Sequence, residues 1–278
     1  MKEPHPSSII LLRETAKNEA QAQALKQLVF ERINSGGDKL EPQEARNALY
    51  NGPLNQLCIR LAELSSFRCM WDIPTPETFA ELPSAPALSL DAPADDELDY
   101  EESADASAAD VGFEAALARD PLYRKMQDVE LVLRFFANRQ IEFVEQGRLQ
   151  DYLDVFLKKG NTFSKKLLER YKELFTQTSD FVFELLGEKA FRLYRKRKNS
   201  KDNWGWLDRP TKVVYDALMH AASENLSRKE ELLRLPNWEG RMQKFYKAHH
   251  AIFAGRSTNK QDVLERRRLV LELLTDVR

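Results

Sequence analysis

The sequence predicts a mainly α fold, in which a helical body carries a small β remnant near the N-terminus. Apolar residues recur at helical spacing through most of the 278 residues, whereas only residues 8–12 have the pattern of a short strand. The composition, 42% hydrophobic and 31% charged, is typical of a soluble globular protein with an ample core. No run of about 18 apolar residues is present, and residues 1–8 lack the apolar core of a signal peptide. We therefore expect a cytoplasmic protein without a membrane span.

Proline and glycine residues set the boundaries of the expected helices. Gly36 and Gly37 end the first helix, because glycine readily takes the left-handed conformation of a helix C-cap. Pro42 and Pro121 each stand at a first helical position, and Gly187 ends the longest helix. The strand at 8–12 needs partners, because an isolated strand is unstable. The expected helices lie at 19–34, 42–64 with a break at Gly52-Pro53, 120–140, 148–158, 162–186, 210–226, 228–235, 237–253 and 259–275.

Residues 74–112 are rich in Pro, Ala, Ser and acidic residues and separate residues 1–73 from residues 113–278. We expect a disordered or loosely ordered insertion, because this segment lacks core-forming side chains. Residues 81–110 contain ten acidic residues and no Lys or Arg, so the rest of the chain holds 42 basic against 34 acidic residues. The segment is either a solvated loop or an acidic strip that mimics or repels nucleic acid. The basic remainder suits a polyanionic partner.

The stretch from residue 28 to residue 50, LVFERINSGGDKLEPQEARNALY, places two helices at a Gly-Gly corner. Polar side chains gather near that corner: Arg32, Asn34, Gln43, Glu44, Arg46 and Asn47. One interpretation is a capped corner in which buried polar groups pair with one another. The other is a site in which arginine side chains and backbone amides hold a phosphate.

FERINSGG and QEARNALY in this stretch resemble the signature of the GmrSD-type restriction endonuclease N-terminal domain family, a ParB/sulfiredoxin-like α+β domain associated with phage defence. YRKMQDVELVLRFFA at 123–137, which contains Asp128, Glu130 and Arg134, resembles a second motif of that family. FAGRSTNKQDVLERRRL at 253–269 resembles the end of such domains. The family's Asp-Gly-Gln-Gln-Arg run is absent from this chain, so we expect a member that lacks its N-terminal part.

The resemblance implies that residues 1–73 are the C-terminal portion of the ParB/sulfiredoxin-like domain and that 113–278 form a helical domain. It further implies a bacterial or archaeal defence component, related to domains that bind and hydrolyse nucleoside triphosphates with Mg²⁺ and sense modified DNA. The implied nucleotide- or phosphate-binding residues are Arg32, Asn34, Gly36, Gly37, Gln43, Glu44, Arg46 and Asn47. The resemblance implies that Arg32 and Arg46 contact phosphate. Asn34 and Asn47 hold the loop or the nucleotide, and Glu44 orients an arginine.

The Asp-Gly-Gln-Gln-Arg run is the catalytic signature of the family. This run and a separate nuclease domain are both absent from the sequence, which leaves three functions open. The chain is a nucleotide-binding and DNA-sensing component, or a non-catalytic DNA- or partner-binding subunit that completes a split enzyme. The third alternative is a degenerate helical remnant without a ligand. The implied partners are DNA and a separately encoded N-terminal portion or nuclease subunit.

Residues 192–201 carry six basic residues and no acidic residue, and two tryptophans follow them. Basic side chains neutralise phosphates and aromatic rings stack on bases, which makes this run the best DNA-binding candidate in the sequence. A solvated basic loop that Trp204 and Trp206 anchor to the body is an equal alternative. The DNA-binding candidates are Arg195, Lys196, Arg197, Lys198 and Trp204.

The sequence gives no indication of a metal site. Cys58 and Cys69 lack the spacing of zinc ligands, so we interpret them as structural thiols. His249 and His250 are adjacent and diverge on a helix, so the two rings do not readily bind one metal ion. His220 lies among apolar residues and is interpreted as a core histidine.

Overall fold

The computed structural model describes residues 29–30, 40–80, 108–140, 149–196, 204–254 and 260–276. It confirms a mainly α fold with one small antiparallel sheet, formed by β1 (Arg192–Lys196) and β2 (Trp204–Pro210). The helices are α2 (Pro42–Leu49), α3 (Pro53–Leu61), α4 (Ser65–Met70), α5 (Pro76–Ala80), α6 (Ala108–Arg119), α7 (Pro121–Arg124), α8 (Gln127–Asn138), α9 (Leu149–Gly160), α10 (Lys165–Leu186), α11 (Lys212–Glu224), α12 (Lys229–Leu233), α13 (Trp238–Ala248), α14 (His250–Ala254) and α15 (Lys260–Thr275).

The sheet does not coincide with the predicted strand. Residues 8–12 lie outside the described residues, as does almost all of the expected helix at 19–34. The observed hairpin instead uses residues from the basic segment, where we expected no strand. Its strands form because Leu193 points into the core while Tyr194 pairs across the sheet with Trp206.

Two predicted helices are interrupted, and the expected insertion has helical ends. Met126 has a φ of 52°, a left-handed conformation that separates α7 from α8 within the predicted helix at 120–140. His249 separates α13 from α14. Helices α5 and α6 occupy the two ends of the predicted insertion, and residues 81–107 lie outside the described residues.

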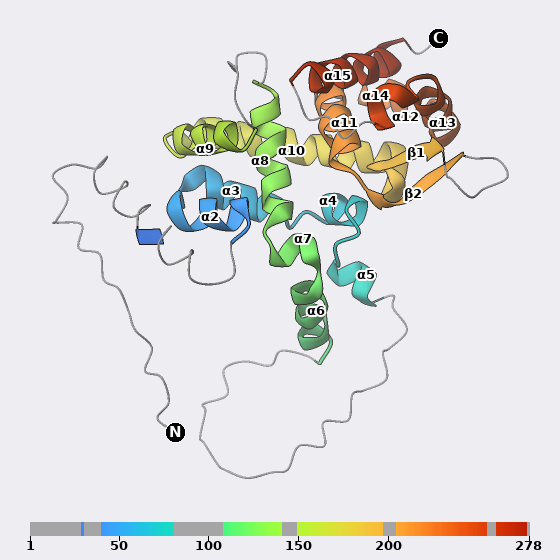
Figure 1. Cartoon of the computed structure of the whole chain (residues 1–278). Helices are drawn as coiled ribbons and strands as arrows, with labels where there is room; N and C mark the ends of the chain where they lie inside the picture. Colours follow the sequence, from blue (N-terminus) through green and yellow to red (C-terminus); the bar gives the residue numbers. More distant parts are fainter. Residues whose placement is uncertain are drawn as a thin grey trace.

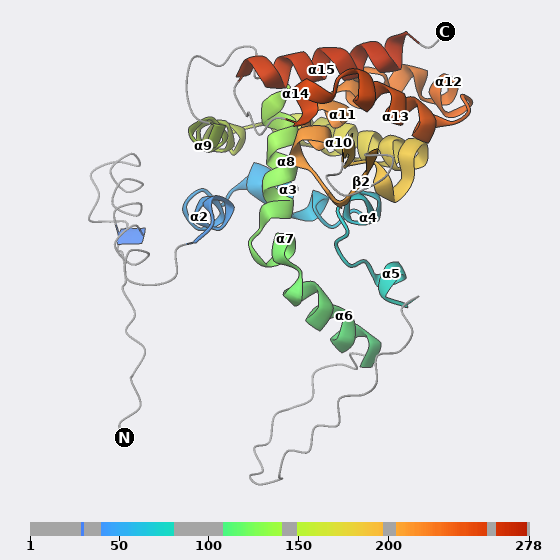
Figure 2. The same ribbon diagram turned by 45° about the vertical axis from the view of Figure 1, so that its right-hand side comes forward.

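Helix α8 runs through the middle of the described part of the chain. Helices α2, α3 and α9 lie on one side of it, and α10 and α11 lie on the other (Figure 1). Helix α15 covers α11 on the outside, as Figure 2 shows. Because every residue of α8 from Asp128 to Asn138 is buried, its polar side chains must find partners inside the protein.

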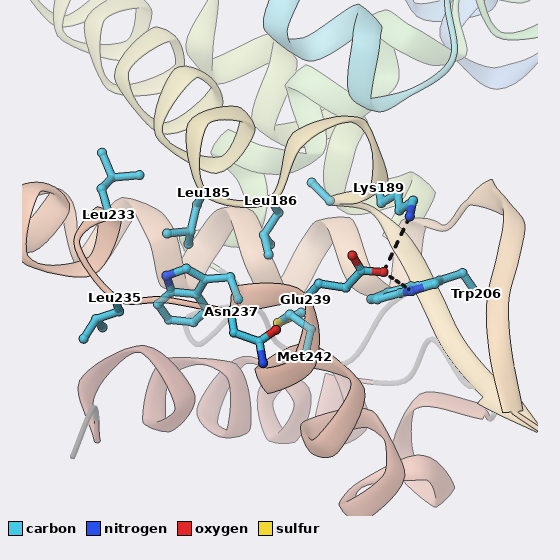
Figure 3. Close-up of a pocket in the computed structure, with 11 residues that line it drawn as sticks. Leu185, Leu186, Lys189, Trp206, Leu233, Leu235, Asn237, Glu239 and Met242 are labelled. Carbon is cyan, nitrogen blue, oxygen red and sulfur yellow. Dashed lines mark hydrogen bonds and ion pairs between the residues drawn. The ribbon is translucent and has the colours of Figure 1, made fainter.

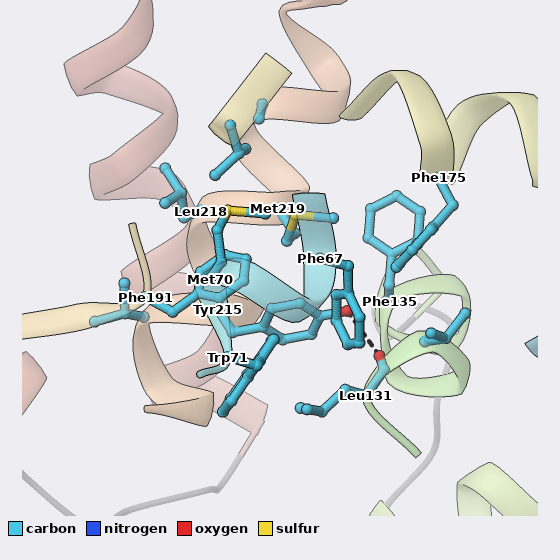
Figure 4. Packing of buried hydrophobic residues seen from close by; sticks show 14 of the residues in the cluster. Phe67, Met70, Trp71, Leu131, Phe135, Phe175, Phe191, Tyr215, Leu218 and Met219 are labelled. Atoms are coloured by element: carbon cyan, nitrogen blue, oxygen red, sulfur yellow. Dashed lines mark hydrogen bonds between the residues drawn. The ribbon is translucent and has the colours of Figure 1, made fainter. Parts of the chain in front are cut away.

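An aromatic cluster forms the core beside α8 (Figure 4). The ring centroids of Phe67 and Phe175 lie 5.6 Å apart, and those of Phe191 and Tyr215 lie 5.0 Å apart. The hydroxyl of Tyr215 donates to the backbone carbonyl of Leu131 in α8 at 2.8 Å. Helices α10 and α11 are therefore packed against α8 by large side chains, and α4 packs on α10 through Phe67 and Phe175.

None of the described helices combines the length and the apolar character needed to cross a membrane. Both cysteines are free thiols, and burial raises the pKa of the Cys58 thiol well above its usual range. Cys58 is therefore unreactive at neutral pH, as expected of a structural thiol.

Candidate functional site

Arg46 is the centre of a buried polar cluster that joins α2, α8 and α9. Its side chain is 2% exposed, and its Nε donates to the Asp154 carboxylate at 2.6 Å. Its Nη1 donates to Glu130 at 3.1 Å and to the side-chain oxygen of Gln43 at 3.3 Å. Its Nη2 donates to the backbone carbonyl of Gln150 at 3.2 Å and also to the Gln150 side chain. These five bonds use the five N–H donors of a guanidinium, so a phosphate must displace a partner to reach Arg46.

Glu130 extends this cluster toward α11. Its carboxylate also accepts from the Nζ of Lys212 at 3.4 Å, although its side chain is only 6% exposed. Burial raises the pKa of Glu130, but the charges of Lys212, Arg46 and Arg134 outweigh that effect and the pKa is lowered. The carboxylate is therefore ionised at neutral pH, and it ties α2 to α11 through α8.

Side-chain amides complete the corner between α2 and α3. Gln43 donates to the Asn55 side chain at 3.4 Å, and Asn55 donates to the side-chain oxygen of Asn47 at 2.7 Å. Asn161 accepts from the backbone N–H of Leu54 at 3.0 Å and donates to the carbonyl of Tyr50 at 2.7 Å. Gln43 and Asn47 thus meet through Asn55 at the corner between α2 and α3, whereas the Gly36-Gly37 corner where we expected them lies outside the described residues.

Glu44 caps the start of α2. Its carboxylate accepts from the backbone N–H of Glu41 at 2.6 Å and closes a capping box at the start of α2. Among the described residues, Glu44 therefore caps a helix and is not bonded to an arginine. The other motif residues, Arg32, Asn34, Gly36 and Gly37, lie outside the described residues.

Arg134 pairs with Asp216 of α11 through two hydrogen bonds, of which the one from Nε is 3.3 Å long. Burial lowers the pKa of Arg134, and the Asp216 carboxylate more than offsets this effect and raises it. Although Glu130 lies four residues before Arg134, the two side chains bond to different partners. The second motif therefore supplies three ion pairs, two through Glu130 and one through Arg134, that hold α8 to α2 and α11.

Asp128 is buried, with 2% of its surface exposed, and lines a pocket of about 410 Å³. One carboxylate oxygen accepts from the backbone N–H of Val129 at 2.8 Å. Burial raises the pKa of Asp128 to about 7, although Val129 and Arg68 act in the opposite direction. Asp128 therefore lines this pocket with a carboxyl group whose pKa lies near neutral pH.

The basic hairpin exposes Arg195 and Lys196 at the end of β1, whereas Arg197 and Lys198 lie outside the described residues. The Trp204 ring stacks on Tyr194, with centroids 5.8 Å apart and an interplanar angle of 21°. The Nζ of Lys247 lies 5.8 Å from both ring centroids. Trp204 is therefore anchored to α13 next to exposed basic side chains. This arrangement is compatible both with DNA binding and with a solvated basic loop.

A separate pocket of about 390 Å³ lies between the end of α10 and α13 (Figure 3). Leu185, Leu233 and Trp238 supply apolar walls. Glu239 at one side accepts from the indole N–H of Trp206 at 3.0 Å and pairs with Lys189 at 3.5 Å. This carboxylate is already satisfied, so the pocket offers no free catalytic group. No group of His, Cys, Asp and Glu side chains suited to a metal ion occurs in the described ranges.

Asp154, Lys212 and Asp216 were missed by reasoning from the sequence. Asp216 had a detectable signal, because it stands alone among apolar residues of α11 and a lone buried charge needs a partner. Asp154 and Lys212 look like ordinary surface charges in the sequence, and only the tertiary fold brings them to Arg46 and Glu130.

Comparisons of this chain with protein-family models, with curated proteins and with solved structures found no match.

Proposed function

We propose that this chain is a cytoplasmic component of a GmrSD-type, modification-dependent defence system in a bacterium or archaeon. In this role the helical body holds the RINSGG segment in position for a nucleoside triphosphate, and hydrolysis requires a further polypeptide. The observation that supports the proposal is the pairing of Arg46 with Glu130, because it joins two of the three stretches on which the resemblance rests. Arg46 serves as a structural anchor, which leaves phosphate binding to Arg32.

Thermal melting with and without Mg²⁺-triphosphates tests this proposal. At about a hundred times the dissociation constant, a bound triphosphate stabilises a protein by about 2.7 kcal/mol. We expect at least one triphosphate to raise the melting temperature and Arg32→Ala to abolish that increase while leaving the unliganded protein folded. We expect no hydrolysis by the chain alone. The absence of any shift with all four triphosphates contradicts the proposal.

DNA binding by the hairpin is a second candidate function. Arg195 and Lys196 are exposed beside the Tyr194–Trp204 stack, and Lys247 adds a third positive charge near those rings. Positive charge next to aromatic rings is the combination that nucleic-acid surfaces use. Titration of a fluorescent duplex at several salt concentrations tests this candidate, because phosphate contacts make affinity fall steeply with salt.

A further inference from the structure

The pocket at the start of α8 has an unusual combination of walls. Ile59, Met126 and Val129 supply apolar surface, and the half-exposed Tyr123 ring stands beside them. Two oppositely charged side chains, Arg68 and Asp128, also line this pocket. Its volume of about 410 Å³ falls within the range of small-molecule sites.

Both charged side chains are largely buried and make few hydrogen bonds to the described residues. Asp128 is 2% exposed, and its carboxylate accepts from the backbone N–H of Val129 at 2.8 Å and from its own backbone N–H. Arg68 is 6% exposed, and its side chain makes one hydrogen bond to the described residues, from Nε to the carbonyl of Ala62 at 3.2 Å. Its guanidinium lies 5.9 Å from the centroid of the Tyr123 ring.

Arg68 and Asp128 do not pair with each other, since no ion pair among the described residues joins them, yet Arg68 lowers the pKa of Asp128 through its charge. A ligand that presents N–H donors to Asp128 and acceptors to Arg68 gains charge-assisted hydrogen bonds to two side chains that line the pocket.

We propose that this pocket binds a guanine base, with Asp128 accepting from N1–H and N2–H and Arg68 donating to O6 and N7. Guanine carries two adjacent donors on one edge and two adjacent acceptors on another, which matches a carboxylate and a guanidinium. Adenine lacks the carbonyl oxygen and presents an amino donor in its place. The apolar walls and the Tyr123 ring suit the faces of a flat base.

Protonation of Asp128 sets the pH range of this recognition. A protonated carboxyl group donates a proton where guanine needs an acceptor, so binding requires the ionised form. Burial places the pKa of Asp128 at about 7, and guanosine affinity should fall by about tenfold per pH unit below that value. The other charged or titratable groups facing Asp128 are Arg68, Glu63, Asp120, Tyr123 and Arg124.

Calorimetric titration of the full chain with guanosine, inosine and adenosine at pH 8 tests the assignment. Inosine lacks the N2 amino group, so we expect weaker binding than for guanosine, and adenosine should bind at least about tenfold more weakly. Asp128→Asn and Arg68→Gln should each reduce guanosine affinity by about tenfold or more, the usual effect of losing a hydrogen bond to a charged group. Glu114→Gln, on the exposed side of α6 and outside the pocket, is the matched control and should leave affinity unchanged.

Equal affinities for guanosine and adenosine, or no binding of guanosine at millimolar concentration, would overturn the assignment. An unchanged affinity in Asp128→Asn has the same consequence. If the variants fail to fold, the comparison of the three nucleosides with the unaltered protein still decides. Guanosine carries no phosphate, so this outcome is independent of the triphosphate response that Arg32 is expected to control.

Discussion

The Nη1 atom of Arg46 lies 3.1 Å from the Oε2 atom of Glu130, and both side chains are almost completely buried. Arg46 comes from α2 and Glu130 from α8, 84 positions later in the chain. The contact joins two helices far apart in the sequence, and it satisfies charges that neither helix can satisfy alone.

Replacing Arg46 by Ala should destabilise the protein by about 3 to 5 kcal/mol, because the buried Glu130 carboxylate then keeps only Lys212 as a cationic partner and Asp154 loses its ion pair. Urea unfolding monitored by circular dichroism measures this loss. Arg60→Ala, which removes an exposed arginine from α3, is the matched control and should change stability by less than about 0.5 kcal/mol. Similar losses for the two variants would show that the Arg46 cluster is not a structural anchor.

The sequence predicted the helix boundaries well where proline and glycine mark them. Pro42 and Pro53 begin α2 and α3, and Gly187, with a φ of 61°, ends α10. The hairpin was missed because its strands are rich in charge and follow no clear alternation of apolar and polar residues.

The motif residues of the site were found, but most of their partners were not. The sequence motifs contain Gln43, Arg46 and Glu130, and the structure brings these three residues together in one cluster. Asp154, however, is 108 positions from Arg46, so no local pattern relates the two residues. Glu130 lies four residues before Arg134 on the same helix, but packing of α8 on α11 pairs Arg134 with Asp216 instead.

Changing Arg195 and Lys196 to Ala should flatten the salt dependence of duplex DNA binding if the hairpin contacts phosphates. Each lost contact should reduce the slope of log affinity against log salt by about 0.9, so the double variant should lose about 1.8. Fluorescence anisotropy at several salt concentrations measures the slope. Lys165→Ala with Lys166→Ala, which removes two exposed charges at the start of α10, controls for net charge. Equal slopes for both double variants would assign the hairpin to a solvated surface.

Asp128 should make the protein less stable as pH rises from about 4 to about 7. Its pKa is near 4 in the unfolded chain and about 7 in the folded protein, so the folded state binds the proton more tightly over that interval. The stabilisation is therefore fully present at low pH and is lost as pH passes through 7. Urea unfolding from pH 4 to pH 7 measures this dependence, and Asp128→Asn should remove it. Identical dependence of the free energy of unfolding on pH in the parent and in Asp128→Asn would contradict the prediction.

His220 should make the protein less stable as pH falls, which is the opposite pH dependence to that of Asp128. Burial, together with the charges of Arg267 and Arg139, lowers the pKa of His220 to about 3, whereas its value in the unfolded chain is about 6.5. The unfolded chain binds the proton first, so this contribution is present above about pH 6.5 and is lost as pH falls toward 3. His220→Gln should reduce the acid sensitivity of stability, and measurement of the midpoint of urea unfolding from pH 7 to pH 4 checks this. An unaltered slope would mean that the imidazole is already solvated.

A double-mutant cycle on Arg46 and Glu130 tests the central claim most directly. The free energy of unfolding is measured for the parent, Arg46→Met, Glu130→Gln and the double variant, because these replacements keep side-chain volume while removing charge. Residues in one buried ion-pair network couple by about 0.5 to 3 kcal/mol. We predict that the double variant is less destabilised than the sum of the single variants by at least about 1.5 kcal/mol. Additivity within about 0.3 kcal/mol would contradict the account, because the two motifs would then be stabilised independently.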